Sequence, residues 1–157
     1  MISIAVDDRV IMARLAAMPD KLRARLLKTT YALAEKLKSK VQQNLTNRLL
    51  KIQTGKLVRS IFEQVTNGTN EVAGRVFSSG LPYAAIQEFG GQTKAHIIEA
   101  KNGKALMFNM GGKAVFFKRV HHPGSNIKGA HYMGEAFKEM TPEIQASYEQ
   151  AVSQGTK

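Results

Sequence analysis

The sequence predicts an α+β protein, with a long N-terminal helix and a C-terminal helix packed on a curled antiparallel sheet of four to five strands. Three observations lead to this class. Apolar residues recur at helical spacing between residues 21 and 51, their period changes to two from residue 62 onward, and helical spacing returns from about residue 132. Helices followed by strands and then by a helix are typical of α+β folds.

The first third of the chain carries the strongest helical pattern. Residues 1–6 indicate a short strand, and a short helix is expected to follow and to end at Pro19. Residues 21–51 contain no Pro or Gly, and their apolar side chains are spaced mostly four apart from Leu22 to Leu49. A helix of some 30 residues spans roughly 45 Å, whereas a compact domain of this size has a diameter of about 40 Å. We therefore expect this helix to bend or to protrude.

Strand patterns and turn residues alternate in the middle of the chain. A short helix over residues 81–89 is closed by Gly90, and a loop is expected over 121–129. The C-terminal helix is expected from about Tyr132 to Val152, with a restart near Pro142. The expected strands alternate in hydropathy between turn residues and cover 62–66, 71–77, 96–100, 105–109 and 114–120.

Length and composition predict a single domain and exclude several classes of protein. The chain has 157 residues and no cysteine, which excludes disulfides, zinc–thiolate sites and cysteine nucleophiles. No apolar run approaches the length of a membrane span, and the first residues do not resemble a secretory signal, so we expect a cytoplasm or a particle assembled in one. The domain, residues 1–157, is expected in three parts: the N-terminal strand and helices (1–52), the sheet with a short helix and loops (53–130), and the C-terminal helix and tail (131–157).

Positive charge is concentrated in the long N-terminal helix. The chain carries 23 Lys and Arg against 12 Asp and Glu, and eleven of the cations lie between Lys21 and Arg59 with Glu35 as the one acid. Such a field favours an anionic partner such as DNA or an acidic protein face, although a solvated helix face in a basic protein has the same pattern. The candidate interaction residues are Lys21, Arg25, Lys28, Lys36, Lys38, Lys40, Arg48 and Lys51.

Patterns that would indicate catalysis are weak. The three Gly-Lys pairs lack the remaining residues of a phosphate-binding loop, and His121, His122 and His131 lack further ligands at metal-binding spacing. Glu88 and His96 can be interpreted as an acid–base pair, but a Glu before Phe-Gly-Gly more often fixes a turn. We expect Phe89 to be buried there and Gly90 to supply a backbone angle that larger residues resist. The sequence therefore predicts no enzyme, no metal and no cofactor.

One strand pattern permits a nucleic-acid interpretation. Residues 114–120 (AVFFKRV) interleave aromatic residues with cations, which can stack single-stranded bases. A sheet strand with one buried face and a basic end has the same pattern.

Three segments in fixed order resemble a family of virion proteins. They are residues 54–61 (TGKLVRSI) after the basic helix, residues 83–90 (YAAIQEFG), and the hairpin at 101–108 followed by residues 120–124 (VHHPG). Their order and spacing resemble the tail-completion, or head–tail joining, proteins of long-tailed bacteriophages and prophages. The resemblance covers roughly residues 7–140, and it departs from the family pattern at residues 128–133 (KGAHYM). The motif residues are Thr54, Gly55, Tyr83, Glu88, Phe89, Gly90, His122, Pro123 and Gly124.

The resemblance implies a structural role at the phage neck. Such proteins form a ring of six identical subunits where the tail tube meets the head connector or head-completion protein, and double-stranded DNA passes through the channel. They have no cofactor and no membrane partner. The glycine-rich stretches 78–95 and 100–130 are our candidates for contacts between rings. The alternative function is a small basic nucleic-acid-binding protein, and a phage-encoded enzyme or toxin is a third class.

Overall fold

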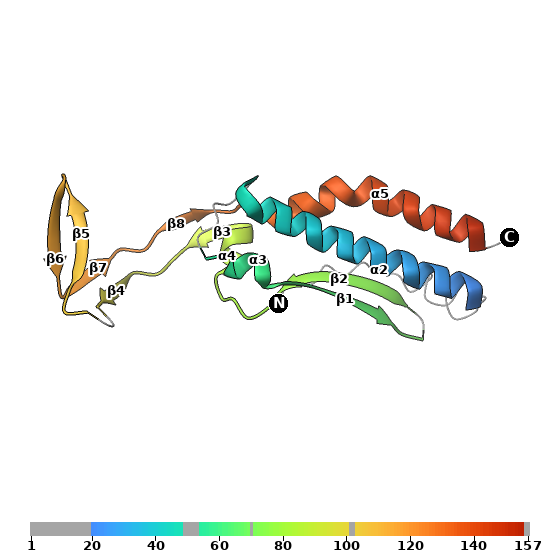
Figure 1. Ribbon diagram of the computed structural model, residues 1–157, viewed down its shortest axis with the longest axis horizontal. Helices are drawn as coiled ribbons and strands as arrows, with labels where there is room; N and C mark the ends of the chain where they lie inside the picture. The colour runs from blue at the N-terminus through green and yellow to red at the C-terminus, as the bar shows by residue number, and fades with distance from the viewer. Residues whose placement is uncertain (1–19, 49–53, 70, 101–102, 156–157) are drawn as a thin grey trace.

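The computed structural model describes residues 20–48, 54–69, 71–100 and 103–155. Within them the chain forms an elongated molecule, in which a body of two long helices and one β-ladder continues into an arm at one end (Figure 1). The expected strand at residues 1–6 and the helix ending at Pro19 lie outside the described residues.

The body is built around two long antiparallel helices. Helix α2 (Asp20–Gln43) continues into a π-helical turn, η1 (Asn44–Arg48), and helix α5 (Tyr132–Gly155) packs along α2. Buried apolar residues of the body form two clusters, which contain Val41, Leu45, Ile61, Tyr132 and Ala136 near the arm and Leu22, Leu26 and Ala151 at the far end. The repeat of apolar residues every three or four positions is what allows each helix to bury one stripe.

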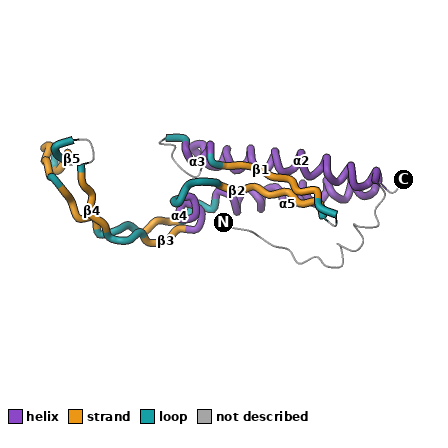
Figure 2. The backbone as a smooth tube through the Cα atoms, turned by 90° about the horizontal axis from the view of Figure 1, so that it is seen from below, coloured by secondary structure: helices purple, strands orange, loops and turns teal. Residues whose placement is uncertain are grey.

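A two-stranded antiparallel ladder covers the opposite side of α2. Strands β1 (Ile61–Asn67) and β2 (Val72–Ser78) pair over their full length and contact α2, so the body has the layers β1–β2, α2 and α5 (Figure 2). Gly74 permits close packing here, because a Cβ at that position would lie 3.1 Å from the Thr30 methyl group.

Two short helices join the body to the arm. Helix α3 (Lys56–Arg59) precedes β1, and helix α4 (Ala84–Phe89) follows β2 and leads directly into the first arm strand. Helix α4 also contacts the start of α5, so the arm begins at the end of the body where η1 and the start of α5 lie.

The arm consists of three antiparallel ladders placed end to end. They are β3 (Gly90–Gln92) with β8 (Asn126–Lys128), β4 (His96–Glu99) with β7 (Arg119–His122), and the terminal hairpin of β5 (Leu106–Met110) with β6 (Lys113–Phe117). One register holds from β3–β8 into β4–β7, whereas β5–β6 is shifted by five residues. Six residues of the chain separate Glu99 from Leu106, but Lys118 alone separates Phe117 from Arg119 on the return. The terminal hairpin accordingly lies across the arm (Figure 1).

The α+β class and both long helices are confirmed, while the strands are arranged differently from our expectation. They form four two-stranded ladders in place of one curled sheet of four to five strands. The physical reason is that residues 90–128 run outward and return as one long interrupted hairpin, so successive strands lie end to end and cannot pair side by side.

Three element boundaries also differ from the sequence prediction. Helix α5 continues through Pro142 without a restart, and the Thr141 hydroxyl donates to the Phe137 carbonyl oxygen at 2.9 Å. The expected loop over 121–129 contains half of β7 and all of β8, because β8 pairs with the Gly90–Gln92 strand that we expected only to close α4. Helix α2 ends at Gln43, and η1 carries the helical path to Arg48.

Candidate assembly interface

The terminal hairpin of the arm exposes apolar side chains on both of its faces. Cross-strand pairs share a face, so Met107 and Phe116 lie on one side of the hairpin and Phe108 and Phe117 on the other. Met107 is 68% exposed and Phe116 65%, and the Phe108 and Phe117 rings contact each other at 6.3 Å between centroids. Met110 is exposed beside the turn. Neither face is therefore packed on the body.

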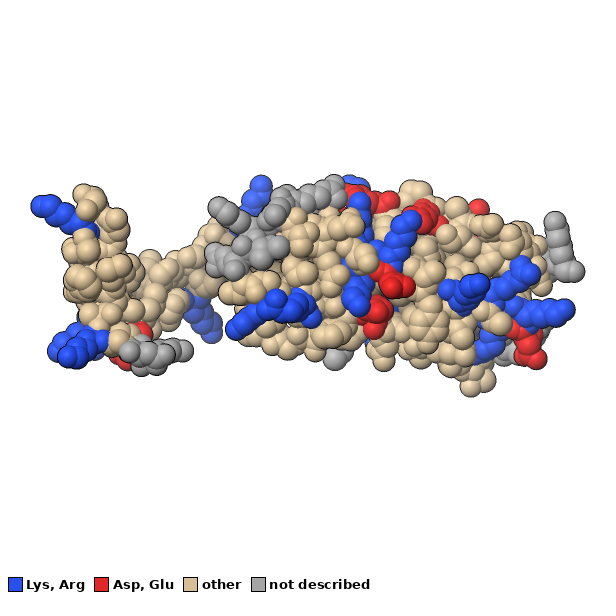
Figure 3. Space-filling view, viewed as in Figure 1, with Lys and Arg blue, Asp and Glu red and all other residues tan. Residues whose placement is uncertain are grey.

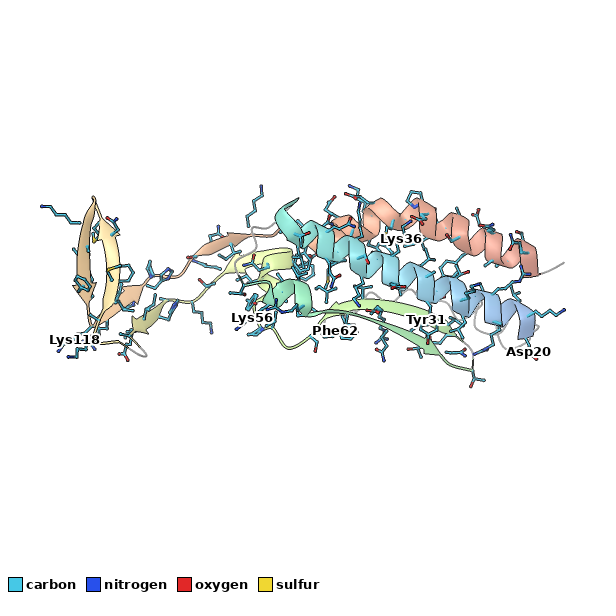
Figure 4. The ribbon with its side chains drawn as sticks, viewed as in Figure 1. Asp20, Tyr31, Lys36, Lys56, Phe62 and Lys118 are labelled. Atoms are coloured by element: carbon cyan, nitrogen blue, oxygen red, sulfur yellow. The ribbon has the colours of Figure 1, made fainter. Side chains whose placement is uncertain are left out.

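Cations surround this apolar hairpin. The described part of the arm, residues 90–100 and 103–128, contains six Lys and Arg side chains and Glu99 as the one acid. Lys118 lies at the base of the hairpin (Figure 4), and blue side chains mark the end of the arm in the space-filling view (Figure 3). The six cations are Lys94, Lys104, Lys113, Lys118, Arg119 and Lys128.

Glu88 fixes the root of the arm to helix α5. Its side chain is buried, and its carboxylate accepts hydrogen bonds from the backbone N–H groups of Met133 (2.8 Å) and Gly134 (2.9 Å) in the first turn of α5. These N–H groups have no partner within a helix, so an acceptor from another segment satisfies them and complements the helix dipole. Glu88 is thus a structural cap, whereas His96 lies out in the arm, stacked on His122; the two do not form an acid–base pair.

Buried polar contacts extend this joint around Tyr132. The Tyr132 hydroxyl donates to the Ala84 carbonyl oxygen at 3.2 Å, and the Asn44 side-chain amide donates to the Tyr132 carbonyl oxygen at 3.0 Å. Burial, with a contribution from the Glu88 charge, raises the pKa of the Tyr132 hydroxyl to about 12. A neutral tyrosine therefore ties α4, η1 and α5 together.

Gly90 has the conformation that the sequence predicts. Its φ is +76°, and a Cβ there would lie 2.6 Å from the backbone nitrogen of Gly129 on the facing strand. A Cβ at Gly129 would in turn lie 2.6 Å from the Phe89 carbonyl carbon. The two strands can approach this closely at the arm root because both positions lack side chains.

The prediction that Phe89 is buried is wrong, because its side chain is 55% exposed. Helix α4 buries Ala84 and Glu88, which are four residues apart and share one face. Phe89 follows Glu88 by one residue and therefore points away from that face. Tyr83, at the start of α4, is also exposed, so both aromatic residues of this motif belong to the surface.

The remaining motif residues shape turns. Arg59 donates to the Thr54 carbonyl oxygen at 3.1 Å, and Gly55 has φ +67° at the start of α3. In the arm, the His122 ring stacks on His96 at 5.0 Å between centroids, and His122 Nδ1 accepts from the Gly124 N–H at 3.0 Å. The exposed Pro123 and the half-buried Gly124, which has a φ of +93°, then lead the chain from β7 towards β8.

Three of the candidate cations of α2 form ion pairs with other elements of the body. Lys38 pairs with Glu63 of β1 at 2.7 Å, which lowers the pKa of the Glu63 carboxyl group through its hydrogen bond to the ammonium. Lys40 pairs with Glu139 of α5 at 2.7 Å, and Lys36 pairs with Glu143. A shallow groove between α2 and α5 is lined by these two α5 pairs. The sequence prediction missed this compensation because the carboxylates are distant in the chain.

The other candidate cations differ in their surroundings. Lys21 and Lys28 are exposed, and Arg25 donates to the Gln154 side chain at 3.1 Å. The Arg48 side chain and Lys51 lie outside the described part of the structure. The end of α2 farthest from the arm therefore keeps an exposed positive surface.

Neither a metal centre nor a membrane span is found among the described residues. No group of three His, Asp or Glu side chains in these segments is placed to hold a metal ion. No described helix is both long enough and apolar enough to cross a bilayer. Comparisons with protein-family models, with curated proteins and with solved structures find no match for this chain.

Proposed function

We propose that this chain is a structural virion protein that completes the tail of a long-tailed phage at the head–tail junction. The observation that carries the proposal is the arm, which presents a hairpin with exposed apolar residues on both faces. An isolated two-stranded hairpin is marginally stable in water, and exposed apolar patches mark surfaces that contact other macromolecules. The arm therefore has the character of an assembly element.

The described body supports the same interpretation. Its buried carboxylate, Glu88, is occupied as a helix cap, and three cations of α2 are occupied in ion pairs. These groups are therefore engaged in contacts within the fold. The proposed role requires neither catalysis nor a cofactor.

The place in the particle follows from the resemblance of the motifs to neck proteins. In this proposal, six copies form a ring between the tail tube protein and the head connector or head-completion protein. The exposed cations Lys21 and Lys28 then face either the DNA in the channel or an acidic neighbouring ring. Assembly takes place in the cytoplasm of the bacterial host.

Inactivation of the gene in a phage or prophage that encodes it tests the proposal. We expect filled heads and separate tails in place of complete particles, and complementation by the wild-type chain should restore infectious virions. The double variant Met107→Ser/Phe116→Ser should fail to complement because it removes one apolar face of the hairpin. The matched control Asn109→Ser changes an exposed polar residue on that face and should complement fully. Absence of the protein from purified virions would contradict the proposal.

A second candidate, a small basic nucleic-acid-binding protein, is favoured by one observation. The cations Lys113 and Lys118 border the exposed Phe116 and Phe117, and cations beside aromatic rings can hold single strands. A monomer whose DNA affinity falls steeply with salt, and which loses that affinity in Phe116→Ser, would support this second function.

A further inference from the structure

We propose that the arm contains a pH-sensitive elbow, which holds the terminal hairpin in one direction while His122 is neutral and releases it when His122 is protonated. The elbow consists of residues 93–95 and 123–125, between the β3–β8 and β4–β7 ladders. It goes beyond the proposed function and does not depend on it. Three observations support it: a gap in the strand pairing, a hydrogen bond that only a neutral ring can accept, and a second histidine stacked on the first.

The two chain segments of the elbow share few hydrogen bonds. At its inner end, the Thr93 N–H donates to the Ser125 carbonyl oxygen at 2.9 Å, and the Thr93 hydroxyl accepts from the Ser125 N–H at 2.7 Å. Beyond this pair, residues 94–95 and 123–124 of the described arm make no backbone hydrogen bond to each other. The path of the chain through the elbow therefore depends on other contacts.

The ring of His122 makes one of these contacts. Its Nδ1 accepts a hydrogen bond at 3.0 Å from the N–H of Gly124, where φ is +93°. A Cβ at Gly124 would overlap the Thr93 carbonyl oxygen, so the two segments approach each other closely at this point. The turn at Gly124, and with it the position of the facing segment, therefore depends on the acceptor that His122 supplies.

This hydrogen bond requires a neutral His122. A backbone N–H can only donate, so Nδ1 must carry a lone pair, and the proton of the neutral ring is then on Nε2. The charged ring has a proton on both nitrogens and cannot accept. Histidine is the side chain that typically changes its charge between pH 5 and 8. Protonation of His122 would therefore turn two donors, its own Nδ1–H and the Gly124 N–H, towards each other.

His96 adds a second charge beside the first. It is the cross-strand partner of His122, and the centroids of the two stacked rings are 5.0 Å apart. The Nδ1–H of His96 donates to the Lys94 carbonyl oxygen at 3.1 Å, and the charged ring keeps this donor. His96 can thus be protonated without loss of its hydrogen bond, whereas His122 cannot. When both rings are charged they also repel each other.

No carboxylate faces the two rings within the described arm. Strands β4 and β7 make their main contacts with each other. Glu99, the one acid of the described arm, pairs in register with Arg119, and Ile97 pairs with His121. These residues lie on the opposite face of the ladder from His96 and His122, because side chains alternate along a strand.

The other charged residues of the described arm are all cations, among them Lys94 and Lys118. Charge on the two rings therefore adds to an excess of the same sign. The hydrogen bonds within the ladders do not involve histidine side chains and should persist. At low pH the outer arm should accordingly take a range of directions while its strands stay paired (Figures 1 and 2).

NMR spectroscopy of the full chain between pH 8 and pH 5 tests the hydrogen bond. The Gly124 amide proton resonance should move upfield as the pH falls, in parallel with the titration of the His122 ring. Its protection from exchange, corrected for the intrinsic rate, should fall roughly fivefold, as for the loss of one hydrogen bond. A Gly124 amide that does not follow the His122 ring would overturn the proposal.

Pulsed electron paramagnetic resonance measures the direction of the hairpin. The chain has no cysteine, so spin labels can be placed at Ala85→Cys in α4 and Asn109→Cys in β5, two exposed positions on either side of the elbow. We expect a narrow distance distribution at pH 8 and a broad one at pH 5. A control pair in the body, Gln64→Cys with Gln145→Cys, should not change. Broadening of the control pair as well would show unfolding of the body and would overturn the proposal.

Three variants separate the acceptor from the ring. In His122→Asn, the side-chain oxygen can accept from the N–H two residues later and does not titrate, so the distribution should stay narrow at both pH values. In His122→Phe, a ring remains but the acceptor is lost, so the distribution should be broad at both. His121→Asn, on the opposite face of the ladder, should keep the response of the wild-type chain. A full pH response in His122→Asn, or its loss in His121→Asn, would contradict the role of His122.

Discussion

Removal of the Glu88 carboxylate should destabilise the whole body, although the residue lies in a six-residue helix next to the arm. Its two oxygens accept the N–H groups of Met133 and Gly134, and its side chain is 4% exposed. In Glu88→Ala, both N–H groups lose their acceptor at the buried start of α5. In Glu88→Gln, the shape is kept, but one oxygen becomes an amide that cannot accept.

The magnitude follows from the number of hydrogen bonds lost. A buried donor without a partner costs about 1–3 kcal/mol, and loss of a helix cap costs about 0.5–2 kcal/mol. Both free-energy ranges describe the loss of the same hydrogen bonds and are not added. We expect about 3 kcal/mol for Glu88→Ala and about half of that for Glu88→Gln. A loss of about 3 kcal/mol is a large part of the stability of a domain this size.

Urea unfolding followed by circular dichroism measures this change. The expected result is a lower midpoint with an unchanged slope, because the surface exposed on unfolding stays the same. Glu149→Ala is the control: it removes an exposed carboxylate from the same helix and should change stability by less than about 0.5 kcal/mol. A free energy of unfolding for Glu88→Ala equal to that of Glu149→Ala would refute the role of Glu88 as a cap.

Four further predictions concern the same joint and the body. The Tyr132 hydroxyl has a folded-state pKa of about 12 against its ordinary 10, so stability should fall as pH rises from about 10 to 12, and Tyr132→Phe should flatten alkaline melting curves. Lys38 lowers the pKa of Glu63, so this ion pair stabilises the folded state above the ordinary carboxyl pKa of 4.5. That stabilisation is lost as the pH falls, and Lys38→Gln should therefore make the fall in stability smaller in an acid titration. Phe89→Ala should cost less than about 1 kcal/mol, because the side chain is exposed. Gly90→Ala should cost more than about 1 kcal/mol, because of its positive φ and the close facing backbone, and should speed hydrogen exchange at the arm root.

Each of these predictions has a contrary outcome. Alkaline curves that stay the same in Tyr132→Phe would show that its ionisation is not linked to folding. An unaltered acid transition in Lys38→Gln would remove the Glu63 pair from the stability of the body. A loss of several kcal/mol in Phe89→Ala would mean that the ring is buried after all, as expected for large core residues. Wild-type exchange in Gly90→Ala would show that the strands tolerate a side chain there.

The helices could be predicted from the sequence because their burial is periodic along the chain. Leu22, Leu26 and Val41 of α2 face the core at helical spacing, and the Asn-Gly turn marks the β1–β2 hairpin. The alternation of apolar and polar residues along the chain also located strands β5 and β6. The pattern assigns a residue to a strand, but it does not say which strand is the neighbour or whether a face is covered.

For that reason, the pairing of the arm strands and the contacts around the arm could not be predicted from the sequence. The pattern of residues 105–109 and 114–120 predicts two strands of one curled sheet, whereas in the described part of the chain this hairpin pairs with no third strand. The capping role of Glu88 depends on residues about 45 positions away, and the pair of Lys38 with Glu63 joins a helix to a strand. Contacts of this kind depend on how elements are brought together in three dimensions, which hydropathy alone does not encode.

The shared joint at Glu88 and Gly90 has a mechanical consequence for the position of the arm. Glu88 is bonded to the first turn of α5, and Gly90, two residues later, begins the arm. Helix α5 and the arm are thus anchored at one joint. A small change of angle at this joint is magnified along the length of the arm, so the terminal hairpin moves much farther than the joint itself (Figure 1).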